Sequence, residues 1–233
     1  AAINVNNNST ITKITNTGTL QGQNGVAFWG GKIQTLINSG TIISSSTDSS
    51  NTYFNASGLM LKNANSRIEH VVNNGTIIGN STRGADGNTC KGCGIFVEVA
   101  NFGTIDNNKQ GLIKGSEGIA LLSYGGVRAQ GILINNAGTI EAMKSGIRLD
   151  TASDVDIINN SGTIIAGENG IRLHVVGWGG NAYIKAGTID NSGTIIATND
   201  GISMTDNGAG NNSMVTIENL TSSGTIQAGR YGI

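Results

Sequence analysis

Hydrophobic and polar residues alternate along this chain in short runs that are separated by glycine. Ile140 and Ala142 fall on one side of a predicted strand, and Ile147 and Leu149 fall on one side of the next. Side chains of a β-strand alternate between its two faces, so each run predicts a short strand with one apolar face. The pattern therefore predicts a chain built from strands.

These strands belong to a repeat. Gly-Thr-Ile recurs, and in four copies, beginning at Gly138, Gly162, Gly193 and Gly224, Gly-Ile follows it eight residues later. Repetition at this scale is typical of units that stack along one axis. The Gly-Ile position, or its equivalent, follows the whole chain as Gly25, Gly58, Gly94, Gly118, Gly146, Gly170, Gly201 and Gly232.

A third strand per repeat is indicated by an aliphatic residue four positions before the motif glycine. This residue is Leu36, Val71, Ile134, Ile158, Ile189 and Leu220 in successive repeats. We therefore predict an all-β fold, a right-handed parallel β-helix with three sheets and about eight coils, as a single domain over residues 1–233. At about 4.8 Å per coil the rod would be roughly 35–40 Å long. Because Ile233 follows one residue after a strand glycine, we expect the natural chain to continue.

Asparagine recurs two positions before the motif glycine. Identical asparagines that are stacked coil on coil can hydrogen-bond as a ladder. We expect such a structural ladder from Asn16, Asn38, Asn73, Asn136, Asn160 and Asn191.

Two repeats are longer than the others, and the extra residues form inserted loops at 44–56 and 79–93. Both insertions fall at the same corner of consecutive coils. Insertions on one side of a solenoid often form a binding site, although a surface loop can also be tolerated without a function.

Composition narrows the possible functions. Charged residues make up 12% of the chain, about half the usual fraction, and the net charge is −1. No basic field is present to hold phosphate backbones, so nucleic acid is not an expected partner. Asn, Ser and Thr must then supply most of the polar surface, which can hydrogen-bond to another copy without charge repulsion.

Cys90 and Cys93 lie at the end of the second insertion. A CxxC pair can be a redox dithiol, half of a zinc site or a small disulfide loop. Zinc needs two more ligands, and the chain offers only His70 and His174. We favour a structural disulfide, and we expect no metal and no cofactor.

Charged residues on the second strand form one candidate binding patch. Arg148 and Arg172 occupy the same outward position on neighbouring coils, and Asp150 and His174 follow two residues later. Two neighbouring cations repel each other unless an acid or a ligand lies between them. The patch is either a solvated face with Asp150 as the partner of the arginines or a site for an anion or a sugar.

Met60 and Phe96 are a second candidate, because both point outward two positions after their strand glycines. An exposed apolar pair beside the inserted loops would form a contact patch. The other interpretation is that a loop covers them.

Two further patterns have both a functional and a structural interpretation. Trp29, Tyr124 and Trp178 each precede Gly-Gly, and an aromatic residue on a turn either stacks on a sugar or packs against the turn. Glu168 and Asp200 are the acids closest to a hydrolytic pair, but both lie in turn signals. We therefore do not expect an enzyme.

The repeated Asn-Ser-Gly-Thr-Ile, as at 38–42 and 160–164, followed by Gly-Ile-Arg-Leu, as at 146–149, resembles the passenger domains of bacterial autotransporters, which use type V secretion. Within that family the chain is most similar to the self-associating, AIDA-like adhesins. The resemblance implies a C-terminal outer-membrane β-barrel translocator in the full-length chain, and a location at the surface of a Gram-negative bacterium. A cysteine pair departs from the near-absence of cysteine in such passengers.

We accordingly expect a cell-surface adhesin that mediates bacterial self-association or attachment to host cells. Its partners would be copies of itself on neighbouring cells, or a host surface protein or glycan. Two alternatives remain: a polysaccharide-acting lyase or hydrolase, and a glycan-binding β-helix without turnover.

Overall fold

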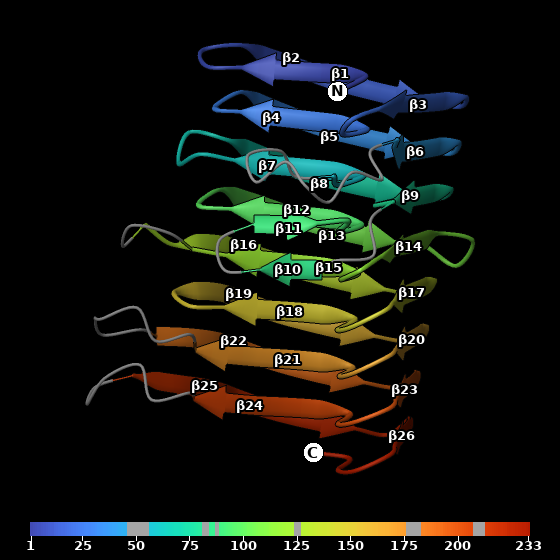
Figure 1. Cartoon of the computed structure of the whole chain (residues 1–233), viewed down its shortest axis with the longest axis vertical. Helices are drawn as coiled ribbons and strands as arrows, with labels where there is room; N and C mark the ends of the chain where they lie inside the picture. Colours follow the sequence, from blue (N-terminus) through green and yellow to red (C-terminus); the bar gives the residue numbers. More distant parts are fainter. Residues whose placement is uncertain (46–55, 81–83, 87–88, 124–126, 176–182, 207–212) are drawn as a thin grey trace.

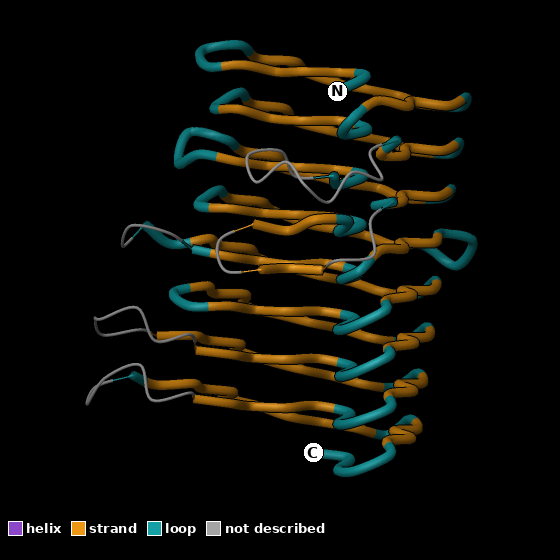
Figure 2. Tube along the Cα trace, in the orientation of Figure 1, coloured by secondary structure: helices purple, strands orange, loops and turns teal. Residues whose placement is uncertain are grey.

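The computed structural model describes residues 1–45, 56–80, 84–86, 89–123, 127–175, 183–206 and 213–233. The chain winds as a right-handed parallel β-helix, as predicted, in which each coil contributes one strand to each of three eight-stranded parallel sheets. Figure 1 shows the eight coils stacked along the long axis, with the termini at opposite ends. Figure 2 shows how the strands follow one another around each coil, with loops and turns at the corners.

Sheet A contains β1 (Ile3–Asn6) and the seven strands that follow the glycines of the Gly-Ile positions. These seven strands are β4 (Val26–Trp29), β7 (Leu59–Lys62), β12 (Ile95–Glu98), β15 (Ile119–Leu122), β18 (Ile147–Asp150), β21 (Ile171–Val175) and β24 (Ile202–Asp206).

Sheet B contains the longest strands, and each ends in the asparagine ladder or its equivalent position. Its strands are β2 (Thr10–Asn16), β5 (Lys32–Asn38), β8 (Arg67–Asn73), β13 (Asn101–Asn107), β16 (Ala129–Asn136), β19 (Ser153–Asn160), β22 (Tyr183–Asn191) and β25 (Met214–Ser222). In each of these strands the pairing skips one residue, for example Gly103 opposite Ile132, so the strand bends there and two successive side chains lie outside the coil.

Sheet C is formed by the Thr-Ile strands. Its strands are β3 (Thr19–Gly22), β6 (Thr41–Ser44), β9 (Thr76–Ile78), β14 (Leu112–Gly115), β17 (Thr139–Ala142), β20 (Thr163–Ala166), β23 (Thr194–Ala197) and β26 (Thr225–Ala228).

The core is the narrow space enclosed by the three sheets. The isoleucines of sheet C stack in register, and Ile77, Ile113 and Ile140 are fully buried. The turn from sheet C to sheet A is so tight that a Cβ on Gly118 would lie 2.3 Å from Ile140 Cγ2 and 2.4 Å from the carbonyl oxygen of Gly146. This close approach explains why glycine precedes the sheet A strands.

Both insertions connect sheet C to sheet A, at the predicted corner. Residues 46–55 of the first insertion lie outside the described residues. In the second, β10 (Gly84–Asp86) and β11 (Thr89–Lys91) form an antiparallel hairpin. Figure 1 shows this hairpin in front of the strands of sheet A. Within the described part of the chain, no helix is long and apolar enough to cross a membrane.

Candidate functional site

The candidate residues of the second strand lie on the outer face of sheet A. Phe96 pairs with Met60 in the ladder, whereas Arg148 pairs with Arg172 and Asp150 with His174. The predicted stacking is therefore present. The exposure of the face differs from the prediction.

Met60 and Phe96 do not face water. Both side chains are fully buried in a second apolar cluster, outside the coil core, together with Ala27, Ala120, Leu122, Cys90 and Cys93. The insertion that ends in the two cysteines covers this part of the sheet. Met60 and Phe96 therefore pack against the insertion and hold it on the sheet. The interpretation of an exposed contact patch is corrected, and the alternative of an overlying loop describes the structure.

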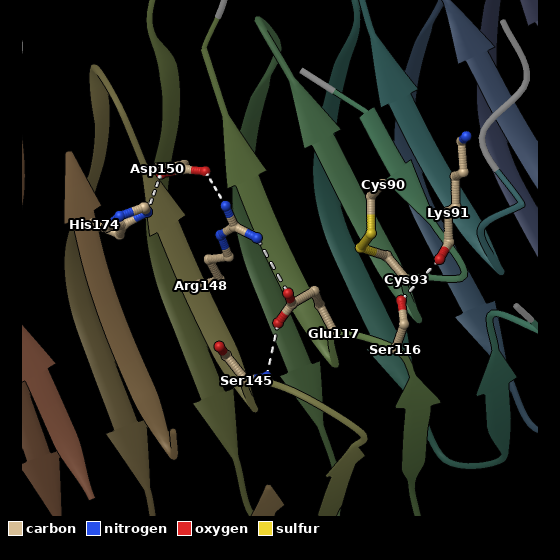
Figure 3. Close-up of polar contacts among 9 residues, drawn as sticks. All are labelled: Cys90, Lys91, Cys93, Ser116, Glu117, Ser145, Arg148, Asp150 and His174. Carbon is tan, nitrogen blue, oxygen red and sulfur yellow. Dashed lines mark hydrogen bonds and ion pairs between the residues drawn. A yellow bond between two sulfur atoms is a disulfide. The ribbon is translucent and has the colours of Figure 1, made fainter. Parts of the chain in front are cut away.

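Cys90 and Cys93 form a disulfide, and neither residue is exposed. The hydroxyl group of Ser116 donates a hydrogen bond of 2.9 Å to the carbonyl oxygen of Lys91, and the backbone N–H of Ser116 donates to the carbonyl oxygen of Gly92 at 2.6 Å. Figure 3 shows the disulfide beside this contact. The end of the hairpin is thus fastened to the coil below it.

Arg148 is the centre of a buried network of charges. Its guanidinium group donates to Glu117 Oε1 at 3.2 Å and also pairs with Asp150. Asp150 in turn lies 3.3 Å from Nδ1 of His174, and Glu117 accepts a hydrogen bond of 2.8 Å from the backbone N–H of Ser145 (Figure 3). The network therefore links three successive coils through β18, β21 and the turn before β15.

This network bears on the two interpretations of the charged patch, a solvated face or a site for an anion or a sugar. Asp150 forms an ion pair with Arg148, as one interpretation predicted for both arginines, but Arg148 is only 6% exposed and Asp150 2%, so this part of the face is not solvated. Arg172 is half-buried. Each buried charge therefore depends on its partners for the stabilisation that water would otherwise give.

Burial shifts the pKa values of the charged groups. It raises the pKa of Glu117 above its usual value, although Arg148 and the Ser145 N–H oppose the shift. Burial and the neighbouring charge of Arg148 together lower the pKa of Arg172. On the same face, burial raises the pKa of Glu98, against the effect of its ion pair with Lys62. Burial thus disfavours the charged forms of these groups, and their ion pairs offset part of that cost.

The asparagine ladder is continuous inside the rod. Side-chain amides donate from one coil to the next over distances of 2.7–2.9 Å, from Asn16 through to Asn191. All six predicted members lie in it. Each amide from Asn16 to Asn160 also donates to a backbone carbonyl group of the next coil, as Asn136 does to Thr163.

Two members of these networks were missed in the sequence. Asn107 joins the ladder between Asn73 and Asn136, but it lies four residues before Gly111 instead of two, so the spacing rule passed over it. Glu117 directly precedes a strand glycine, at the position of Asn169 and Asp200 in later coils. An acid at a position that the repeat buries was the signal that could have identified it.

The remaining candidates are not members of the Arg148 network, although the charge of Glu168 acts on Arg172 and that of Arg172 acts on Asp200. Arg230 donates two hydrogen bonds to the carboxylate of Asp200, from Nε to Oδ1 at 2.9 Å and from Nη2 to Oδ2 at 2.7 Å. This bidentate contact lowers the pKa of Asp200. Glu168 lies at the corner of the preceding coil, where its carbonyl oxygen accepts the Asn199 N–H. Of the aromatic-Gly-Gly turns, Trp29 is partly buried, with the Lys62 ammonium group 5.6 Å from the centre of its ring, whereas 124–126 and 178–180 lie outside the described residues. Among the described residues, no cluster of His, Cys, Asp and Glu could hold a metal ion.

The outer face of sheet C is open and bears a column of threonines. These side chains are half-buried or exposed and lie in register on successive strands, interrupted once by Leu112. The members are Thr19, Thr41, Thr76, Thr139, Thr163, Thr194 and Thr225. Beside the column, Ile165 is 40% and Ile196 37% exposed.

The chain was compared with known protein families, with curated proteins and with solved structures, and nothing matches in any of the three comparisons.

Proposed function

We propose that this chain is the β-helical passenger of an autotransporter and acts as a cell-surface adhesin through association with copies of itself. The observation that supports this best is the open outer face of sheet C. It presents hydroxyl groups and isoleucines, and its Lys114 and Glu141 form an ion pair at 2.6 Å.

A surface of this kind suits pairing between identical copies. Two copies related by a twofold axis bring the same patch together, and a column with almost no net charge meets itself without repulsion. Hydroxyl groups that repeat every 4.7–4.9 Å would offer donors and acceptors at matching intervals. Each contact is weak, but many copies on each cell multiply the contacts.

The test is clumping of bacteria that display the chain. Replacing Thr163 and Thr194 together by glutamate places like charges on both partners of a self-pair, so clumping should be lost. Thr188→Glu on the outer face of sheet B is the matched control and should still clump. A further variant, Ser45→Glu, places charge at the edge of the first insertion and reports whether the loops take part. Undiminished clumping of the sheet C variant would refute pairing through this face.

The alternative, attachment to a host surface, can be tested with the same bacteria that display the chain. It predicts adhesion to host cells without clumping, and this adhesion should survive the sheet C variant. A polysaccharide-acting enzyme would instead release sugar fragments from glycans on incubation with the purified chain.

A further inference from the structure

A shallow groove follows the outer face of sheet B along the rod axis. Its lining comes from five successive strands, β8, β13, β16, β19 and β22. Four strand spacings give the groove a length of roughly 19 Å. A ligand that fills it would therefore be elongated and would cross the strands instead of lying along one of them.

One wall of the groove is a straight column of polar side chains. Successive members pair with each other in the sheet register, so they lie one strand spacing apart. In chain order they are Arg67, Asn101, Gln130, Asp154 and Lys185. Cation, amide, amide, acid and cation thus offer hydrogen-bond donors and acceptors in turn.

The other wall is formed at the bends of the strands, where the register skips a residue. Ile132 and Asp156 project there, but Gly103 and Gly187 contribute no side chain. A Cβ on Gly103 would lie 2.3 Å from the carbonyl oxygen of Glu69, so no larger residue fits. The wall is consequently open at both glycines.

The floor lies between the two walls at Phe102 and Gly131. A Cβ on Gly131 would lie 1.9 Å from Phe102 Cζ, which shows that the ring occupies the space that a side chain would need. Phe102 belongs to the coil core and is only 2% exposed, so the floor is formed by backbone, and Ile132, 52% exposed, supplies the apolar surface of the groove.

Three polar groups of the groove have unused hydrogen-bonding capacity. Among the described residues, the side chains of Asn101, Gln130 and Asp156 have no hydrogen-bond or ion-pair partner. Gln130 and Asp156 are exposed and Asn101 is half-buried, so a ligand can reach all three.

Three of the four charged side chains that line the groove form ion pairs within the protein. Arg67 pairs with Glu69, and Lys185 pairs with Glu218 at 2.8 Å. Asp154 is paired with Arg128, and the acid that remains is Asp156. A polyanion would meet no uncompensated cation here and would be repelled by Asp156.

We propose that this groove binds an uncharged oligosaccharide laid along the rod axis. Its hydroxyl groups would use the amides of Asn101 and Gln130 and the carboxylate of Asp156, and an apolar ring face would rest on Ile132. A peptide fits less well, because extended peptides usually bind by adding a strand at a sheet edge, and the groove crosses a sheet face. The proposal goes beyond self-association and rests on a different sheet.

The experiment measures binding of the purified chain to neutral oligosaccharides of about four to six sugar residues, a length suited to the groove of roughly 19 Å. Sulfated and uronic acid chains of equal length, and an extended peptide, serve as comparisons. We expect a neutral oligosaccharide to bind and the charged chains to bind at least about tenfold more weakly. Asn101→Ala and Gln130→Ala should each weaken binding by about two- to tenfold, and together by tenfold or more.

Asn159→Ala is the matched control, because it removes an amide from the same sheet face outside the groove and should leave the affinity unchanged. Unchanged thermal unfolding of the groove variants would show that the fold is intact. Absence of binding to every neutral oligosaccharide, preference for the charged chains or the peptide, or unchanged affinity in the double variant would each overturn the proposal. Clumping of displaying cells should be unaffected by the groove variants, so the two proposals fail separately.

Discussion

The outer faces of sheets A and C are built from the same repeat but have opposite environments. On sheet A an insertion covers a buried apolar cluster, and the network around Arg148 is buried on the same face. On sheet C the face is open, and its ion pair between Lys114 and Glu141 has both side chains more than 40% exposed. The same type of outward position therefore serves cohesion where it is covered and remains available for partners where it is open.

The largest expected difference concerns the two ion-pair sites. Arg148→Ala would leave Glu117 and Asp150 buried without their cation, so the free energy of unfolding should fall by about 3–5 kcal/mol. Lys114→Ala removes a cation from the open face and should cost at most about 1 kcal/mol. Urea unfolding of both variants at neutral pH measures the difference, and equal losses would contradict the distinction between the faces.

Apolar side chains give a second test of the same contrast. Phe96→Ala empties a fully buried position on the covered face and should lower the free energy of unfolding by about 3 kcal/mol or more. Ile165→Ala removes a side chain that is 40% exposed on the open face of sheet C and should cost less than about 1 kcal/mol. If the insertion did not cover sheet A, the two losses would be similar.

The ladder allows a comparison of an inward and an outward asparagine on two neighbouring strands of sheet B. Asn136→Ala removes the acceptor of the Asn107 amide and the donor to Asn160, and should lower the free energy of unfolding by about 1–3 kcal/mol. Asn159→Ala, on the outside of the next strand, should change it by no more than about 0.5 kcal/mol. A ladder that contributes nothing would give the same small change in both variants.

The smallest expected effect is on pH dependence. Because burial raises the pKa of Glu117 in the folded state, the native protein binds more protons than the unfolded chain, and stability should fall as pH rises from the ordinary glutamate pKa to the raised one. Glu117→Gln should flatten this slope, with a remainder from Glu98.

Asp200 should change stability with pH in the opposite direction to Glu117. Its pKa is lowered by Arg230, so its contribution is present above its ordinary pKa and is lost as pH falls through the lowered value. Asp200→Asn should therefore change only the acid end of the profile. Unfolding midpoints measured from pH 3 to pH 8 test both variants, and an unchanged slope in Glu117→Gln would contradict the assignment.

The coil architecture was predictable because its causes are local and repeated. Glycine before each sheet A strand and alternating isoleucines reveal the winding, and the stacked register then places Arg148 next to Arg172. The packing of the second insertion on sheet A was not predictable, because a repeat pattern does not indicate where an insertion folds back. For this reason Met60 and Phe96 were expected at the surface, and the partnership of Glu117 with Arg148 was missed. The groove of sheet B was also missed, because it depends on bends in the strands and on the absence of side chains at two glycines.

The central claim is that the threonine column of sheet C lies between paired copies of the chain. The most direct measurement is a scan of single cysteines along the column, at Thr139, Thr163 and Thr194, in bacteria that display the chain and clump. Both natural cysteines are already joined in a disulfide, so each new thiol is the only one added. The account predicts disulfide-linked dimers from at least one column position and none from Thr188→Cys on sheet B. Clumping cells that yield no linked dimers from any column position would contradict it.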